Sequence, residues 1–73
     1  MICEAHVGPK RLRTGGAPFD VFVWQRTGVS AATVDGEPVA VNEGDCALLE
    51  KGSVYDWEVA PGGVLLSVAN AFT

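Results

Sequence analysis

The sequence contains few of the residues that stabilise small domains through disulfide bonds or bound metal ions. It has one histidine and two cysteines, Cys3 and Cys46, in 73 residues. Two cysteines allow at most one bridge, far below the density of a secreted disulfide scaffold. No pair of C-x-x-C motifs is present to hold a structural zinc. We therefore expect free thiols in a protein that is not secreted.

Long apolar runs and basic charge are also scarce. No apolar segment approaches the ~20 residues that span a bilayer, and the first residues lack the charged and apolar regions of a signal peptide. The net charge is −4, and an acidic chain repels the phosphates of nucleic acid. The sequence predicts a cytoplasmic or particle-associated protein with neither a membrane nor a nucleic acid as partner.

Common catalytic motifs are missing as well. There is no Gly-rich phosphate loop, no G-x-S-x-G and no H-E-x-x-H. Cys3 and His6 have C-x-x-H spacing, but residues three apart on a strand point to opposite sides, so a partly exposed terminal strand is expected. Asp56 and Glu58 share one strand face, where a solvated pair is expected rather than an acid and base. These observations predict no enzyme, no cofactor and no metal site.

What the sequence does contain is a succession of short apolar runs separated by turns. Asp35-Gly36, the stretch 42–45 and Lys51-Gly52-Ser53 are turn signals at regular spacing. They predict one all-β domain over residues 1–73, a small antiparallel β-barrel or sandwich with no substantial helix. Strands are expected at residues 1–7, 19–26, 29–34, 37–41, 46–50, 54–59 and 64–72.

Two stretches carry more detailed expectations. Asp-Gly between apolar runs is typical of a type I′ hairpin turn. The expected register pairs Val34 with Glu37, Ala32 with Val39 and Ser30 with Val41. Pro38 lacks an N–H donor, so its nitrogen should face away from any neighbour or its strand should be an edge. Residues 54–59 alternate, which directs Tyr55, Trp57 and Val59 toward the core.

Residues 19–26 carry large apolar groups on both faces of the expected strand. The face with Phe22 and Trp24 indicates a subunit interface and a homo-oligomer, since a chain this short has little to cover it. The alternative is that the N-terminal segment folds over this face. Residues 8–18 are expected to form a basic Gly/Pro loop. Its Lys10, Arg11 and Arg13 either contact an acidic partner or are simply solvated.

The opposite face of the same run points toward a ligand pocket. Phe19, Val21 and Val23 are expected to face Tyr55 and Trp57 across the interior. The Tyr55 hydroxyl and Gln25 would then be the polar groups of the pocket. The alternative is that these side chains fill the interior, as they do in most small barrels.

The spacing of the turn glycines resembles the cupin family. Gly44, Gly52 and the pair Gly44-Asp45 match its second motif, and fifteen residues separate Gly28 from Gly44. The positions where metal-binding cupins carry their two His, one Glu and further His correspond here to Gly15, Ala17, Val21 and Tyr55.

The resemblance implies a cupin-like barrel of the metal-free kind. It also implies that a subunit exchanging its N-terminal strand would supply a missing edge. The function expected is a non-catalytic, homo-oligomeric module that binds a small ligand. The alternative is a structural protein attached to a larger particle, such as an accessory virion protein or a shell component.

Overall fold

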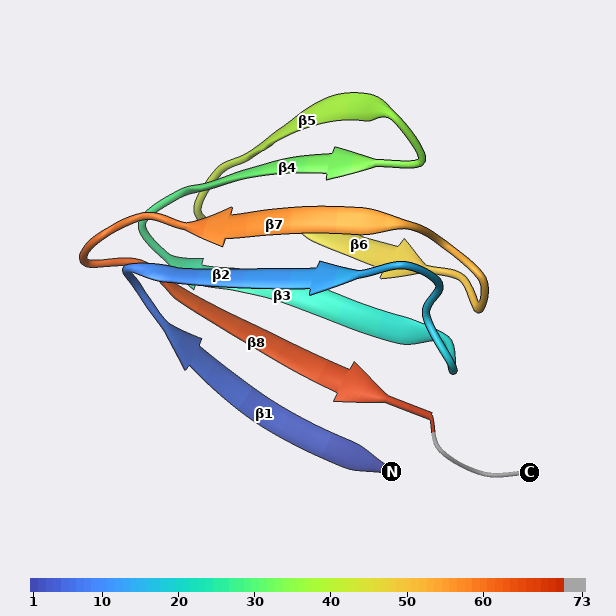
Figure 1. Cartoon of the computed structure of the whole chain (residues 1–73). Coiled ribbons are helices and arrows are strands. Elements are labelled where there is room, and N and C mark those ends of the chain that lie inside the picture. Colours follow the sequence, from blue (N-terminus) through green and yellow to red (C-terminus); the bar gives the residue numbers. More distant parts are fainter. Residues whose placement is uncertain (71–73) are drawn as a thin grey trace.

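The computed structural model describes residues 1–70, which form eight strands and no helix (Figure 1). The strands are β1 Ile2–Val7, β2 Lys10–Thr14, β3 Val21–Thr27, β4 Ser30–Val34, β5 Glu37–Val41, β6 Cys46–Leu49, β7 Tyr55–Val59 and β8 Val64–Ala69. The predicted all-β class is confirmed. The expected last strand extends to residue 72, and its final residues lie outside the described part. No helix long and apolar enough to cross a bilayer occurs within residues 1–70.

The strands form two four-stranded antiparallel sheets (Figure 1). One sheet has the order β1-β8-β3-β6 and the other has the order β2-β7-β4-β5. The buried apolar core lies between the two sheets, because its members come from the inner faces of both. These members are Val23, Leu49 and Leu65 from the first sheet and Ala32, Val41, Trp57 and Val59 from the second.

The β4–β5 hairpin has the register predicted from its turn. Ser30 pairs with Val41, Ala32 with Val39, and Val34 with Glu37. Asp35 and Gly36 both have positive φ, 50° and 84°, as a type I′ turn requires. Pro38 lies on β5, which is the edge of its sheet, so no neighbour needs its missing N–H.

The N-terminal third of the chain differs from its predicted structure. Residues 8–18 were expected to be a loop, but Lys10–Thr14 forms β2 and pairs along its whole length with β7. The first strand pairs with β8 of its own chain. Strand exchange between subunits is therefore not needed to supply this edge. Both differences arise from pairing with strands far away in the sequence, which local composition does not reveal.

Candidate functional site

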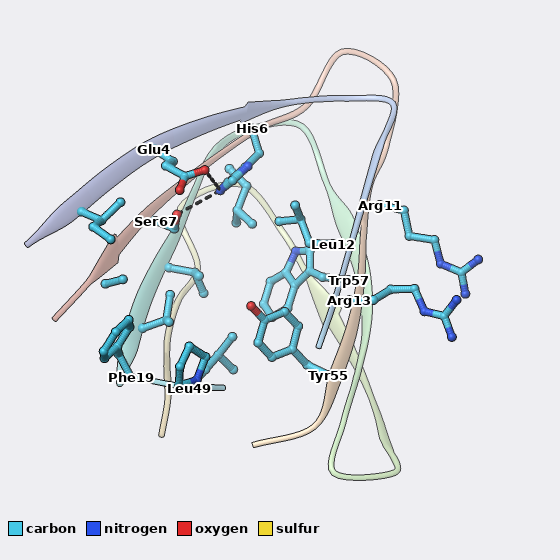
Figure 2. Close-up of a pocket in the computed structure, with 16 residues that line it drawn as sticks. Glu4, His6, Arg11, Leu12, Arg13, Phe19, Leu49, Tyr55, Trp57 and Ser67 are labelled. Carbon is cyan, nitrogen blue, oxygen red and sulfur yellow. Dashed lines mark hydrogen bonds and ion pairs between the residues drawn. The ribbon is translucent and has the colours of Figure 1, made fainter. Parts of the chain in front are cut away.

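A cavity of about 510 Å³ lies between the two sheets and is lined by residues from both (Figure 2). Figure 1 shows that β1 and β8 diverge from β2 toward this end of the molecule. Strand alternation decides which side chains reach it. On β1 and β8 the cross-strand pairs Ile2–Ala69, Glu4–Ser67 and His6–Leu65 all line the cavity. The β2 strand, expected to be a loop, contributes Leu12 to the opposite wall.

The walls of the cavity are mostly apolar and aromatic. Tyr55 and Trp57 come from β7, Phe19 precedes β3, and Leu49 ends β6. Figure 2 shows Tyr55 beside Trp57, with Phe19 and Leu49 together on another side of the cavity. Trp57 is 1% exposed, and its Nε1 has no hydrogen-bond partner within residues 1–70. An indole N–H is a donor only, so this buried group lacks an acceptor.

A polar group of three residues occupies the side of the cavity formed by β1 and β8 (Figure 2). His6 Nε2 lies 2.9 Å from Ser67 Oγ and 4.0 Å from Glu4 Oε2. Burial lowers the pKa of His6, nearby Lys10 lowers it further, and Glu4 opposes the shift. The imidazole is therefore neutral at neutral pH. Its Nδ1 is buried and, within the described chain, has no partner.

This arrangement is suited to holding a small molecule. A cavity of a few hundred Å³ with apolar walls and a few fixed polar groups is the usual form of a ligand site. Buried polar atoms without partners are uncommon, because each costs ~1–3 kcal/mol relative to a hydrogen-bonded one. Trp57 Nε1 and His6 Nδ1 are two such atoms, and both belong to residues that line this cavity. A ligand that hydrogen-bonds to either would remove that cost.

The structure brings five of the six predicted pocket residues together, Val23 among them. Phe19, Val21, Tyr55 and Trp57 all line the cavity, which the interior side chains leave unfilled at this end. Gln25 does not line it. Its side chain is fully buried elsewhere, where Oε1 accepts a hydrogen bond of 2.6 Å from Ser30 Oγ and Nε2 donates to Thr27 O. Both ends of the amide are thus used within the fold.

The two groups of residues predicted to contact partners lie on different sheets. Phe22 and Trp24 are exposed on β3, whereas Lys10, Arg11 and Arg13 lie on β2 of the other sheet. Arg11 makes a bidentate pair with Asp56 of β7, with Nε–Oδ1 at 2.9 Å and a second bond of 2.6 Å to Oδ2. This hydrogen-bonded pair lowers the pKa of Asp56. The basic cluster is therefore part of a strand pairing rather than a free loop.

The residues at the cupin ligand positions do not fit a metal. Gly15, Ala17 and Val21 offer no side-chain donor, and Tyr55 alone is insufficient. Ala17 instead links its segment to the turn after β6 through the backbone. Its N–H donates a hydrogen bond to Ser53 O, and its C=O accepts one from Gly52 N. Within residues 1–70, no three His, Cys, Asp or Glu side chains are grouped to hold a metal ion.

The sequence reasoning missed the polar part of the cavity. His6 was expected on a partly exposed strand, yet it is 6% exposed, while Cys3 on the other face is exposed. The signal available was the alternation of residues 1–7, which places Glu4 and His6 on one face. Ser67 is 61 residues from His6, and no local pattern connects them.

Comparison with known proteins adds a family relationship. No family model matches the chain. It is 43% identical over 49 residues to the 3-hydroxyanthranilate 3,4-dioxygenase of Mus musculus, 45% identical to that of Rattus norvegicus and 39% identical to that of Homo sapiens. Each match covers 67% of this chain and 17% of the relative.

These relatives correct one expectation. The sequence predicted a chain that is not an enzyme, but each of these proteins bears the name of an enzyme. The expectation rested on the absence of nucleophiles, acid–base pairs and cupin metal ligands, whereas the likeness to these proteins is an overall identity over 49 residues. The matched enzyme is a cupin, and the partial matches together with the two antiparallel sheets support a cupin-like relationship for this chain.

Proposed function

We propose that the chain is a cupin-like module whose cavity between the two sheets binds a small planar aromatic molecule. The observation that carries this proposal is an apolar cavity lined by aromatic side chains, where two lining residues, Trp57 and His6, each hold a buried ring nitrogen that has no hydrogen-bond partner within residues 1–70. The aromatic side chains Phe19, Tyr55 and Trp57 provide surfaces on which a flat ring packs by edge or offset face.

The polar groups define what the ligand carries. Trp57 Nε1–H requires an acceptor oxygen. Glu4, whose side chain is 58% exposed beside His6, favours a ligand amine or hydroxyl that donates to its carboxylate. A planar ring with both kinds of substituent meets these requirements. The relatives are named after 3-hydroxyanthranilate, which is a molecule of this class.

The second function expected from the sequence, attachment to a larger particle such as a virion or shell, gains no support from these relatives. They are named as enzymes that act on a small aromatic molecule. Small-molecule binding therefore stands as the proposal.

Calorimetric titration with 3-hydroxyanthranilate tests the proposal. We expect saturable binding to the wild-type chain, and binding about tenfold weaker to Trp57→Phe, which keeps an aromatic ring but removes the N–H donor. Trp24→Phe is the matched control, because Trp24 lies on the exposed face of β3 outside the cavity lining. Its affinity should equal that of the wild type.

Two results would overturn the proposal. One is the absence of binding heat for the folded wild-type chain at millimolar ligand. The other is an equal loss of affinity in Trp57→Phe and Trp24→Phe, which would place the ligand outside the cavity.

A further inference from the structure

The outer face of the β1-β8-β3-β6 sheet is an uninterrupted apolar surface. Strand register aligns its outward side chains in rows that cross all four strands. One row is Cys3, Val68, Phe22 and Leu48, and the next is Ala5, Leu66, Trp24 and Cys46. Phe22 is 45% exposed, Trp24 40% and Leu48 60%. No charged side chain interrupts either row.

Nothing in the described chain covers this face. The N-terminal segment was the alternative cover, but β1 is a strand of this same sheet and β2 belongs to the other one. An antiparallel sheet with water on one side normally alternates apolar and polar residues. Here the inner positions line the core and cavity while the outer positions are equally apolar. Contiguous exposed apolar surface of this extent marks a contact site.

We propose that this face packs against the same face of a second copy of the chain, forming a two-fold dimer. The charges at the two ends of the central strand argue for this occupant. Asp20 precedes β3 and Arg26 lies near its end, at the register shift between Gln25 and Thr27 in the pairing with β8, with Phe22 and Trp24 between them. Asp20 Oδ1 accepts a hydrogen bond from Lys51 N, which holds the carboxylate at its end of the face.

The order of these residues makes the face complementary to itself. Consider a two-fold axis that lies in the plane of the interface and runs perpendicular to the strands. Such an axis reverses the direction of β3 in the partner. It then places the strand end that carries Asp20 against the end of the partner's strand that carries Arg26, and it places Phe22 against Trp24 of the partner. An axis along the strands would instead bring like charges together at both ends. Opposite charges at the rim and aromatic contacts at the centre are the usual pattern of a specific interface.

The size of the face indicates the class of interface that it can form. Four strands spaced ~4.8 Å apart and six residues rising ~3.4 Å each give a face of roughly 19 by 20 Å. The flat area is roughly 400 Å² per copy, and protruding side chains raise the total buried by the pair to about 1,000 Å². That total is at the low end for specific interfaces. We therefore expect dissociation in the micromolar range.

Sedimentation of the full chain between about 1 μM and 1 mM tests the dimer. The wild type should pass from monomer to dimer, and Trp24→Glu should stay monomeric throughout the range. Val54→Glu is the control, since Val54 is 50% exposed in the turn before β7, away from this face. It should dimerise like the wild type. A wild-type monomer at the highest concentration, or a dimer that Trp24→Glu leaves intact, would overturn the proposal.

Leu48→Glu provides a second variant in case Trp24→Glu fails to fold. Leu48 is 60% exposed at the edge strand β6, so its replacement should be tolerated within one chain. Circular dichroism confirms folding of each variant before its mass is measured. A folded Leu48→Glu that dimerises with wild-type affinity would exclude this face as the contact.

Arg26→Glu tests the orientation of the two copies. The introduced carboxylate would lie against Asp20 of the partner, so dimerisation should weaken at low salt and recover as salt screens the repulsion. Arg13→Glu changes the net charge equally but lies on β2 of the other sheet. It should dimerise like the wild type at every salt concentration. Equal behaviour of the two variants would overturn the crossed arrangement.

Discussion

His6 is the residue in which burial and polarity conflict most directly. It is the one histidine of the chain, it is nearly buried, and it shares a hydrogen bond with Ser67. A neutral imidazole satisfies that bond in either tautomer, whereas a protonated one must be stabilised by a largely exposed Glu4 at 4.0 Å against nearby Lys10. The fold therefore favours the neutral form.

Stability should depend on pH through this residue. The pKa of His6 in the fold lies below its ordinary value of 6.5. Well above that value both folded and unfolded chains hold it neutral. As the pH falls through 6.5, the unfolded chain takes up the proton first, and the free energy of unfolding decreases until the folded pKa is passed. The slope is at most about 1.4 kcal/mol per pH unit.

Urea unfolding at about pH 7.5 and about pH 5.5, on either side of the ordinary histidine pKa, measures this effect. The wild type should be less stable at the lower pH, and His6→Gln should show a smaller difference between the two conditions. Most exposed carboxylates titrate below about pH 5, so they contribute little in this window. A wild-type stability that is unchanged or higher at the lower pH would contradict the burial of a neutral His6.

At the scale of elements, the β4–β5 hairpin is the part most firmly determined by local sequence. Gly36 has φ of +84°, and Ala in the left-handed region costs ~1–2 kcal/mol. Gly36→Ala should therefore lower the free energy of unfolding by about that amount. Gly15→Ala is the control, because Gly15 lacks a positive φ and its new Cβ would meet no atom within 4 Å.

Chemical denaturation of both variants checks the hairpin. Gly15→Ala should change stability little or raise it slightly, because Ala restricts the unfolded chain. Equal stabilities of Gly36→Ala and Gly15→Ala would show that the turn conformation is not the one described.

Sequence reasoning succeeded where the information is local. The register of the hairpin follows from two turn residues, and the inward face of β7 follows from alternation at Tyr55, Trp57 and Val59. Five of the six predicted pocket residues reach one cavity for the same reason. Gln25 was misplaced because strand alternation gives the side of a sheet but not the position along it.

Reasoning from local pattern failed where long-range pairing decides the structure. Lys10–Thr14 is flanked by Gly8-Pro9 and Gly15-Gly16 and carries three basic residues, which is the composition of a loop. Its strand conformation comes from the ladder to β7 and from the Arg11–Asp56 pair. The meeting of His6 with Ser67 has the same long-range origin.

At the scale of the whole molecule, the two faces of one sheet form two separate functional surfaces. The inner side of β1-β8-β3-β6 provides His6, Ser67 and Leu49 to the cavity, and its outer side provides the apolar face proposed for the dimer. The two tryptophans report on them separately, since Trp57 lines the cavity and Trp24 lies on the outer face. A signal from Trp57 therefore reports ligand binding, and a signal from Trp24 reports dimerisation.

Binding in the cavity is tested most directly by the indole signals in a nitrogen–proton correlation spectrum. Trp57 and Trp24 give one signal each, and Trp24→Phe assigns them. Titrating 3-hydroxyanthranilate at constant protein concentration should shift the Trp57 signal progressively, because its N–H gains an acceptor, and should leave the Trp24 signal in place. A Trp57 signal that stays unmoved at millimolar ligand, or a shift confined to Trp24, would contradict binding in the cavity.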